Sequence, residues 1–458
     1  MRLFLGIVGL LAAGFCRAAA PSVSVISNTQ LDAHGIYFVS YDGLVSVNSF
    51  QESAVLAFGN WQFAAWYTSS GAAVLARRAL PSGAWSTLQL PHNLSTEDSH
   101  NAINLGVSPA DGKIHVALDC HSTVMFYLYT SSVSNLAASG ASWDASQFAP
   151  VTNTLGTLNI GTEITYPQFV ITPRNSLQLV YRTGVSGDGA TQLAEYTNGI
   201  WSNVGSWASA TGTYTAPDGA VSTLRNLYIH GFTYHGQRAY VSGTWREQNG
   251  AVSCSSLGLT NHDTVYFYSD DLGRTWHNSA GTQIGTSGSN LVNVNTAGII
   301  VDSLDADHGL MNQESQTVDS AGLLHIIISY VPENYETDRP AFARAFHLYQ
   351  SANGTWTKVE IPFAIQSVGR SQIVMDADDN VYVFSPFVRV VTSSKETGWT
   401  DWTIIYNGTA AGLNAFGEVT LDRSRVSSAN IVSVLYQQNG TGTTTPSPVQ
   451  VIDFKLNG

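Results

Sequence analysis

The chain repeats a β-hairpin seven times, and this repeat constrains its fold more than any other feature. In each copy, a strand of alternating apolar residues leads through a polar turn into a second strand rich in β-branched and aromatic residues. The turns use Gly, Asp, Asn and Ser, which reverse a chain readily. The hairpins are Ala54–Phe58 with Phe63–Tyr67, Ile103–Val107 with Ile114–Asp119, Gln168–Ile171 with Leu177–Arg182, Gly231–Tyr234 with Arg238–Gly243, Ser315–Val318 with Leu324–Tyr330, Ser371–Met375 with Val381–Ser385, and Val419–Asp422 with Ile431–Tyr436.

Six of these hairpins are followed by a second hairpin that ends in tryptophan, at Trp85, Trp143, Trp201, Trp276, Trp356 and Trp399. Two hairpins make a four-stranded blade, which buries its faces only against neighbouring blades. The repeat therefore predicts an all-β fold, a seven-bladed β-propeller, as a single domain over residues 21–458. The last blade has its first hairpin and a strand near Val449–Phe454, so we expect the stretch around Ile36–Val47 to complete it.

The N-terminus has the pattern of a secretory signal peptide over residues 1–20. Arg2 precedes an apolar run from Leu3 to Phe15, and the small residues Ala18–Ala20 follow. We therefore expect a secreted, extracellular protein, and no later run is long enough to span a bilayer. Four glycosylation sequons, at Asn93, Asn353, Asn407 and Asn439, fit a secreted glycoprotein. Cys16 leaves with the leader, so that Cys120 and Cys254 either pair or stay free thiols.

The net charge of the chain limits the classes of molecule that it can bind. The formal net charge of −13 becomes −15 without the leader, because the leader carries Arg2 and Arg17 and no acid. This balance argues against binding to nucleic acid or to an anionic membrane. An anionic ligand must then be held by a few local cations. We expect a monomer.

Polar and aromatic residues gather where the first strand of each blade starts and the second ends. These points lie on one face of a propeller, at the channel mouth where ligand sites are expected. Singly, each residue has a structural explanation: a His or Tyr is a satisfied polar group, and an Arg pairs with a carboxylate such as Glu247. The mouth residues are His100, Asn101, His121, Tyr166, Arg182, Tyr228, His230, Arg246, Asn312, Gln313 and Arg370.

The combination of Arg, His and Tyr at one mouth suits β-elimination on a uronic acid. Arg binds the uronate carboxylate, His or Tyr removes the acidified C5 proton, and Tyr protonates the leaving oxygen. Two other motifs say less about function. The Asp-box Ser269–Trp276 predicts a structural turn without a catalytic role. Cys254 and His262, with His230 or His235, match no compact zinc spacing, so we assign no metal ligand.

Several segments resemble the BNR-repeat propeller polysaccharide lyases, which include the ulvan lyases and, most closely, the fungal L-rhamnose-α-1,4-D-glucuronate lyase. The resemblance covers about residues 95–330. Outside this range the chain resembles the family only in its predicted propeller fold. Besides the Asp-box, the resemblance rests on Asp98–Asn101, Gly112–His121, Thr165–Pro167, Leu179–Gly187, His230–Phe232, Thr244–Glu247, Asn261–Asp263 and Asn312–Glu314.

The resemblance implies a lyase that cleaves rhamnose-glucuronate bonds by β-elimination, releasing rhamnose and leaving a 4,5-unsaturated glucuronate. It implies that His100 and Tyr166 transfer protons, with either as the base, and that Arg182 neutralises the carboxylate. No cofactor is required for the chemistry. Some members of the family carry a structural zinc, and a structural Ca²⁺ or Zn²⁺ stays open for this chain. The resemblance makes pocket residues of His121, Tyr228, His230 and Arg246, and from their place at the mouth we expect Asn101, Asn312, Gln313 and Arg370 to bind substrate.

The expected partner is a plant or algal acidic polysaccharide with rhamnose-glucuronate units. Because the chain has 20 Lys and Arg against 33 Asp and Glu, we favour unsulfated rhamnose, as in gum arabic or arabinogalactan side chains, over sulfated ulvan. Three alternatives stay open: an ulvan lyase, a sialidase-like glycoside hydrolase with Arg182, Arg246 and Arg370 around a sugar carboxylate, and a secreted carbohydrate-binding propeller. The last would need aromatic platforms in several equivalent blades.

Overall fold

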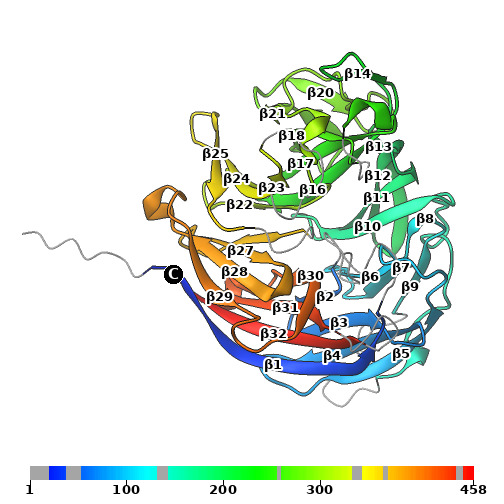
Figure 1. Ribbon diagram of the computed structural model, residues 1–458. Coiled ribbons are helices and arrows are strands. Elements are labelled where there is room, and N and C mark those ends of the chain that lie inside the picture. Colours follow the sequence, from blue (N-terminus) through cyan, green and yellow to red (C-terminus); the bar gives the residue numbers. More distant parts are fainter. Residues whose placement is uncertain are drawn as a thin grey trace, which may run out of the picture.

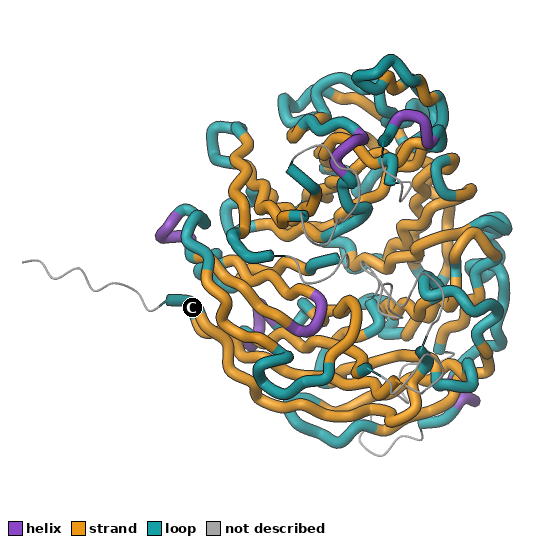
Figure 2. The backbone as a smooth tube through the Cα atoms, in the orientation of Figure 1, coloured by secondary structure: helices purple, strands orange, loops and turns teal. Residues whose placement is uncertain are grey.

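The computed structural model describes residues 20–37, 53–130, 143–254, 259–332, 343–364, 370–439 and 447–458. The predicted signal peptide therefore lies outside the described residues except for Ala20. Strands dominate the described chain, and its helical segments are short turns (Figure 2). None of these segments is long and apolar enough to cross a membrane. They are Ala145–Gln147, Gly250–Val252, Ala306–His308, Pro386–Val388, Lys395–Thr397 and the helix α2 (Val426–Ala429).

Within the described residues, the strands form eight antiparallel sheets. Seven of them follow one another around a ring, which is the predicted seven-bladed β-propeller (Figure 1). We number the blades in chain order. Blade 1 contains β2 (Val55–Phe58), β3 (Trp61–Tyr67), β4 (Ala72–Ala79) and β5 (Ser86–Asn93). Blade 2 contains β6 (Ala102–Val107), β7 (Ile114–Asp119) and β9 (Phe126–Tyr129). Blade 3 contains β10 (Ile164–Ile171), β11 (Leu177–Val185), β12 (Asp188–Thr197) and β13 (Ile200–Ala208), with β8 (His121–Thr123) added beside β10.

The remaining blades continue the ring, and a small hairpin precedes blade 4, made of β14 (Tyr214–Thr215) and β15 (Val221–Ser222). Blade 4 contains β16 (Arg225–His235), β17 (Arg238–Glu247), β18 (Asn261–Ser269), β19 (Thr275–His277), β20 (Gln283–Thr286) and β21 (Ile300–Asp302). Blade 5 contains β22 (Ser315–Val318), β23 (Leu324–Tyr330), β24 (Arg344–Gln350) and β25 (Trp356–Ile361). Blade 6 contains β26 (Gln372–Met375), β27 (Val381–Ser385), β28 (Arg389–Ser393) and β29 (Thr403–Asn407).

An N-terminal strand closes the ring, but it is not the predicted one. Blade 7 contains β30 (Ala415–Asp422), β31 (Ile431–Gln438), β32 (Ser447–Asn457) and β1 (Ser22–Gly35). β1 pairs with β32 from Ser22 with Asn457 to Gly35 with Ser447, and Figure 1 shows it in blue outside the red strands. The expected segment, Ile36–Val47, lies beyond this strand, and its residues after Tyr37 fall outside the described residues. Many β1 side chains are exposed, so an apolar pattern could not reveal it.

Apolar side chains fill the spaces between neighbouring blades. Each of the seven contacts between adjacent blades has its own buried cluster. For example, Trp207 of blade 3 packs with Phe232 and Trp276 of blade 4. Because each blade packs one face against each neighbour, strands such as β6 and β7 are buried on both faces.

A buried polar network joins the first blade to the last. One Nη of Arg78 on β4 bonds both carboxylate oxygens of Asp453 on β32, at 2.8 and 2.6 Å, and its Nε donates to Gln62 Oε1 at 2.8 Å. Asp453 also accepts from Ser433 at 2.6 Å and pairs with Arg425 at 3.3 Å. The ring is therefore closed by polar contacts as well as by β1.

The structure also tests what the sequence predicted for the Asp-box, the sequon at Asn353 and the two cysteines. The Asp-box is a structural turn, in which Asp271 accepts from the Thr275 N–H at 2.8 Å and Trp276 is fully buried. Asn353 lies in the turn between β24 and β25, at a hairpin tip. Cys120 is buried and Cys254 is exposed, and no disulfide joins these two described cysteines.

Candidate active site

The predicted site residues lie at one end of the propeller. The first strands of the blades lie in contact around the channel. Three of the predicted residues, His100, Gln313 and Arg370, lie two positions before the strands β6, β22 and β26. Tyr166 and Tyr228 lie in the first part of two others, β10 and β16. Because each second strand returns antiparallel to the first, its end reaches the same mouth. The end of β11 thus supplies Arg182, and the end of β17 supplies Arg246.

His121 reaches this group through a sharp reversal of the chain. Asp119, Cys120 and Ser122 have positive φ angles of 64°, 80° and 52°, which are rare for residues with side chains. The reversal carries the chain out of blade 2, so that His121 pairs with Thr165 at the edge of blade 3. The Asp119 carboxylate, buried and accepting from the Tyr67 hydroxyl and from the Ser95 N–H at 3.0 Å, holds the turn.

One carboxylate holds both histidines of the mouth. Asp98 Oδ1 lies 2.7 Å from His100 Nδ1, and Asp98 Oδ2 lies 2.6 Å from His121 Nδ1. The two imidazole rings stack with their centroids 4.1 Å apart and 18° between their planes. Burial opposes the charge of Asp98, but the hydrogen bonds from His100 and His121 outweigh it and hold the pKa of Asp98 well below its usual range.

The His100 imidazole is neutral in this setting. Burial is the largest influence and lowers the pKa of His100 to about 4; the positive charges of His121 and Arg370 act in the same direction, while Asp98 raises it. His100 is only 9% exposed. The ring is therefore unprotonated at the mildly acidic and neutral pH at which a histidine base works.

Two tyrosines flank Arg182. The Tyr166 ring centroid lies 6.2 Å from both His100 and His121, and Tyr228 lies 6.2 Å beyond Tyr166. Arg182 lies 5.4 Å from the centroid of each tyrosine ring, and its Nη1 donates to the Tyr228 hydroxyl at 3.0 Å. Burial opposes ionisation of Tyr228, yet the charges of Arg182 and Arg246 prevail and lower the pKa of Tyr228. The mouth is thus electropositive around two phenol groups.

Arg182 has no carboxylate within ion-pair distance among the described residues. Its Nη2 donates to Thr165 Oγ1 at 2.9 Å, and its buried Nε has no hydrogen-bond partner there. The residue is 5% exposed. A buried guanidinium that is bonded only to neutral oxygens is poorly compensated, so it favours an incoming anion. This is the property expected of a residue that binds a uronate carboxylate.

The other two predicted arginines have different surroundings. Arg370 forms a buried ion pair with Glu418, from Nη1 at 2.8 and 3.1 Å, and donates through Nε to the Asn312 carbonyl at 3.2 Å. Arg246 acts on Tyr228 through its charge. Glu247, which sequence reasoning offered as a carboxylate partner at this strand end, instead pairs with Arg225 at 2.7 Å and His262 at 3.0 Å.

The remaining predicted residues line the mouth or support it. Gln313 shares a small cavity with Tyr166, Arg182 and Tyr228. His230 accepts the Glu314 N–H at Nδ1, at 2.9 Å, so its buried Nε2 carries the proton and has no partner in the described chain. Asn101 donates to the Thr96 carbonyl at 3.1 Å, and Asn312 accepts from Asn261 at 2.9 Å. Asn101 is 1% exposed, so it holds the loop in front of His100.

Sequence reasoning assigned no role to Asp98, Thr165 or Glu418, which orient His100, Arg182 and Arg370. Asp98 stood in one of the segments that carry the family resemblance, and it lies two residues before His100, a spacing that permits a side-chain turn. Asp98, His100 and His121 are also the one group among the described residues that could hold a metal ion, with ligand atoms within 4.8 Å of one another. Their hydrogen bonds already satisfy Asp98 and both Nδ1 atoms.

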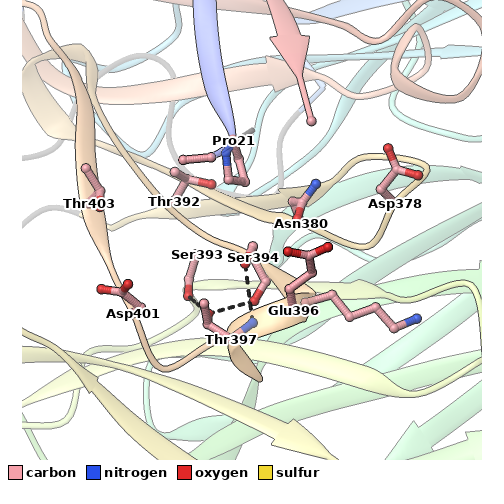
Figure 3. A pocket seen from close by; sticks show the side chains of 13 residues that line it. Pro21, Asp378, Asn380, Thr392, Ser393, Ser394, Glu396, Thr397, Asp401 and Thr403 are labelled. Carbon is pink, nitrogen blue, oxygen red and sulfur yellow. Dashed lines mark hydrogen bonds between the residues drawn. The ribbon is translucent and has the colours of Figure 1, made fainter. Parts of the chain in front are cut away.

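A second hollow lies away from the mouth, on the outer part of blade 6 beside the start of β1 (Figure 3). Most of the residues that line it are of polar types, and the Thr397 hydroxyl donates to the Ser394 carbonyl at 3.0 Å. It contains none of the predicted site residues. The candidate site is therefore the mouth, where the aromatic, histidine and arginine side chains converge.

Comparison with known proteins supports this architecture. The chain is 23% identical to the ulvan lyase, long isoform, of Alteromonas sp. and 24% identical to that of Pseudoalteromonas sp. (strain PLSV). Each match covers 88% of this chain but 43% of the relative, so the chain spans less than half the length of these proteins.

Solved structures show the same fold. The crystal structure of the polysaccharide lyase Uly1 matches with a TM-score of 0.71 at 17% identity, over 93% of this chain and 99% of that one. An ulvan lyase of family PL25 bound to -[GlcA(1-4)Rha3S]- matches with a TM-score of 0.67 at 13% identity, over 93% and 95%. The family described as "BNR repeat-containing family member" matches residues 61–364, more than half of the chain. The protein therefore belongs to the BNR repeat-containing family.

Proposed function

We propose that this protein is a secreted polysaccharide lyase that cleaves the L-rhamnose-α-1,4-D-glucuronate bond by β-elimination. The observation that carries the proposal is Arg182: a buried guanidinium without a carboxylate partner in the described chain, beside a neutral histidine and two tyrosines. A uronate carboxylate supplies the missing charge, and the bound carboxylate makes the C5 proton more acidic.

The proton transfers follow from the same geometry. His100, neutral above about pH 4, takes the C5 proton. The electrons form the C4–C5 double bond as the C4–O bond breaks, and Tyr166 protonates the leaving oxygen. The two rings lie next to each other, with centroids 6.2 Å apart. The reverse assignment of base and acid uses the same two residues and gives the same product.

The choice of substrate rests on the cations at the mouth. Arg370 is bound to Glu418, whereas Arg182 has no carboxylate partner among the described residues, so Arg182 is the cation that we expect to bind the anionic sugar. A sulfate buried without a cation is strongly unfavourable. We therefore propose an unsulfated rhamnose, as in gum arabic or arabinogalactan side chains. Ulvan lyase activity is the second candidate, because the curated relatives are ulvan lyases.

The test is incubation of the protein with gum arabic and with ulvan, reading the ultraviolet absorbance of the 4,5-unsaturated uronate and the release of free rhamnose. We expect both signals with gum arabic. Unsaturated product and a fall in viscosity with ulvan would replace the first candidate by the second. Cleavage without the absorbance would indicate a hydrolase, such as the sialidase-like alternative. Binding without cleavage would indicate a carbohydrate-binding propeller.

Variants of Arg182 connect the activity to the site. Arg182→Ala should lower turnover by about 10² to 10³, the usual loss when one preorganised charge contact is removed. Arg182→Lys should recover part of this, since it restores the charge without the planar fork. The matched control is Arg174→Ala, an exposed arginine in the turn at the opposite end of the same hairpin. Near-normal activity of Arg182→Ala would overturn the assignment.

A further inference from the structure

We propose that Asp98 is the positioning residue of this site, holding His100 and His121 as one stacked pair that accepts a single proton through an Nε2 atom. The reaction that this pair serves rests on the proposed function. The geometry of the pair can be tested without any activity.

The orientation of the two imidazole rings follows from the hydrogen bonds that a carboxylate can accept. An ionised Asp98 has no proton to donate, so the contacts at 2.7 and 2.6 Å require a proton on Nδ1 of both His100 and His121. Proton transfer by either ring must then use Nε2. Because each oxygen of Asp98 is bound to a different ring, neither ring can rotate without losing a charge-assisted hydrogen bond. The stacking of the two rings, with their centroids 4.1 Å apart, also fixes the position of each ring relative to the other.

The surrounding charges allow one proton on the pair, and not two. Of the groups whose charges act on His100, Asp98 favours the protonated ring, whereas Arg370 and a protonated His121 disfavour it. Tyr166 packs beside both imidazoles. Two imidazolium rings stacked at 4.1 Å would repel each other, and one carboxylate compensates one positive charge.

The proton balance of the elimination fits this unit. The pair takes the C5 proton at Nε2 and becomes singly positive next to Asp98, while Tyr166 gives its proton to the leaving oxygen and becomes phenolate. Return of the proton from the imidazolium to the phenolate, directly or through water, restores the starting state. In this scheme Asp98 never accepts the proton itself. It orients the rings and stabilises the charge, as a carboxylate behind a catalytic imidazole does in other enzymes.

Two substitutions separate this role from a structural one. Asp98 also accepts the His100 N–H at 2.9 Å through Oδ1, and Asp98→Asn keeps that turn contact. Its new amide then faces His121 Nδ1 with a donor, which forces the proton of His121 onto Nε2. Asp98→Ala removes the turn contact but presents no donor. If Asp98 positions the histidines, Asp98→Asn should lower kcat at least as much as Asp98→Ala does. If Asp98 serves only the turn, Asp98→Ala should lower kcat more than Asp98→Asn does.

The measurements are kcat, KM and the pH profile on the uronate polymer that the protein cleaves. We expect Asp98→Asn to lose about 10² to 10⁴ in kcat with KM changed less than about threefold. We also expect its acid limb to move to lower pH, because the charge that favours the protonated ring is gone. Asp111→Asn is the control, a turn carboxylate at the other end of blade 2 that should leave kcat unchanged. A kcat near wild type for Asp98→Asn would overturn the proposal.

A spectroscopic readout separates this proposal from the proposed function. In protein labelled with ¹⁵N-histidine and assigned with His100→Gln and His121→Gln, both rings should be Nδ1–H tautomers, and Asp98→Asn should convert His121 to Nε2–H. Nε2–H tautomers in the wild type, or two independent protonations, would overturn the proposal. The expected tautomers in a protein that cleaves no uronate polymer would instead overturn the proposed function alone.

Discussion

Replacing Arg78 by methionine should destabilise the propeller at the point where its ring closes. Arg78 of blade 1 bonds Asp453 of blade 7 through two contacts, and its side chain is 4% exposed. Removing one partner of a buried ion pair costs about 3–5 kcal/mol, because a charge is left buried. Arg425 still pairs with Asp453 at 3.3 Å and Ser433 still donates at 2.6 Å, so we expect the lower end, about 3 kcal/mol.

This cost converts into a measurable shift in melting temperature. Unfolding entropy is about 2.1 cal/mol/K per residue, or about 0.9 kcal/mol/K for a propeller of this length that unfolds as one unit. A loss of about 3 kcal/mol then lowers Tm by about 3 °C. Thermal unfolding followed by circular dichroism checks this value. Arg78→Lys should lie between methionine and wild type, since it keeps the charge but loses the Nε contact with Gln62.

The matched control is Arg344→Met. Arg344 pairs with Glu360 at 3.6 Å within blade 5, and the two side chains are 36% and 50% exposed. An exposed pair contributes about 0–1 kcal/mol, so Tm should change by at most about 1 °C. If Arg78→Met lowers Tm no more than Arg344→Met does, the buried network does not contribute to ring closure and the reasoning is wrong.

Two further predictions concern pH. Burial disfavours the charged form of His262, but bonds to Asp263 at 2.9 Å and Glu247 at 3.0 Å prevail and raise its pKa. Because the pKa of His262 is higher in the folded than in the unfolded chain, this stabilisation is complete below about pH 6.5 and is lost as pH rises through the folded pKa. The difference in Tm between wild type and His262→Gln should therefore shrink as pH rises. A difference that stays constant with pH would contradict this prediction. For His100, with its pKa lowered to about 4 mainly by burial, kcat/KM of the proposed lyase reaction should halve near pH 4. An ordinary histidine would leave about 9% of the base neutral at pH 5.5 where this site leaves about 97%, so a midpoint near pH 6.5 would refute the assignment.

The sequence alone determined the blades. The predicted hairpin Ser315–Val318 with Leu324–Tyr330 has the bounds of β22 and β23. The other six fall on observed strand pairs, with bounds that differ by up to six residues. A hairpin is local: its turn chemistry and the alternation of its side chains are encoded within about twenty residues. The position of the mouth residues at strand ends followed from the same regularity.

The tertiary structure decided which residues meet. β1 closes the ring with β32, more than 400 residues away, and its exposed side chains carry no apolar pattern that predicts this pairing. His121 reaches His100 only through left-handed residues at the end of β7, and the two then share Asp98. The choice of carboxylate was also invisible: Arg370 takes Glu418, and Arg182 takes none among the described residues. Local patterns fix strands, whereas charge pairing depends on distances between chain segments that only the closed ring brings together.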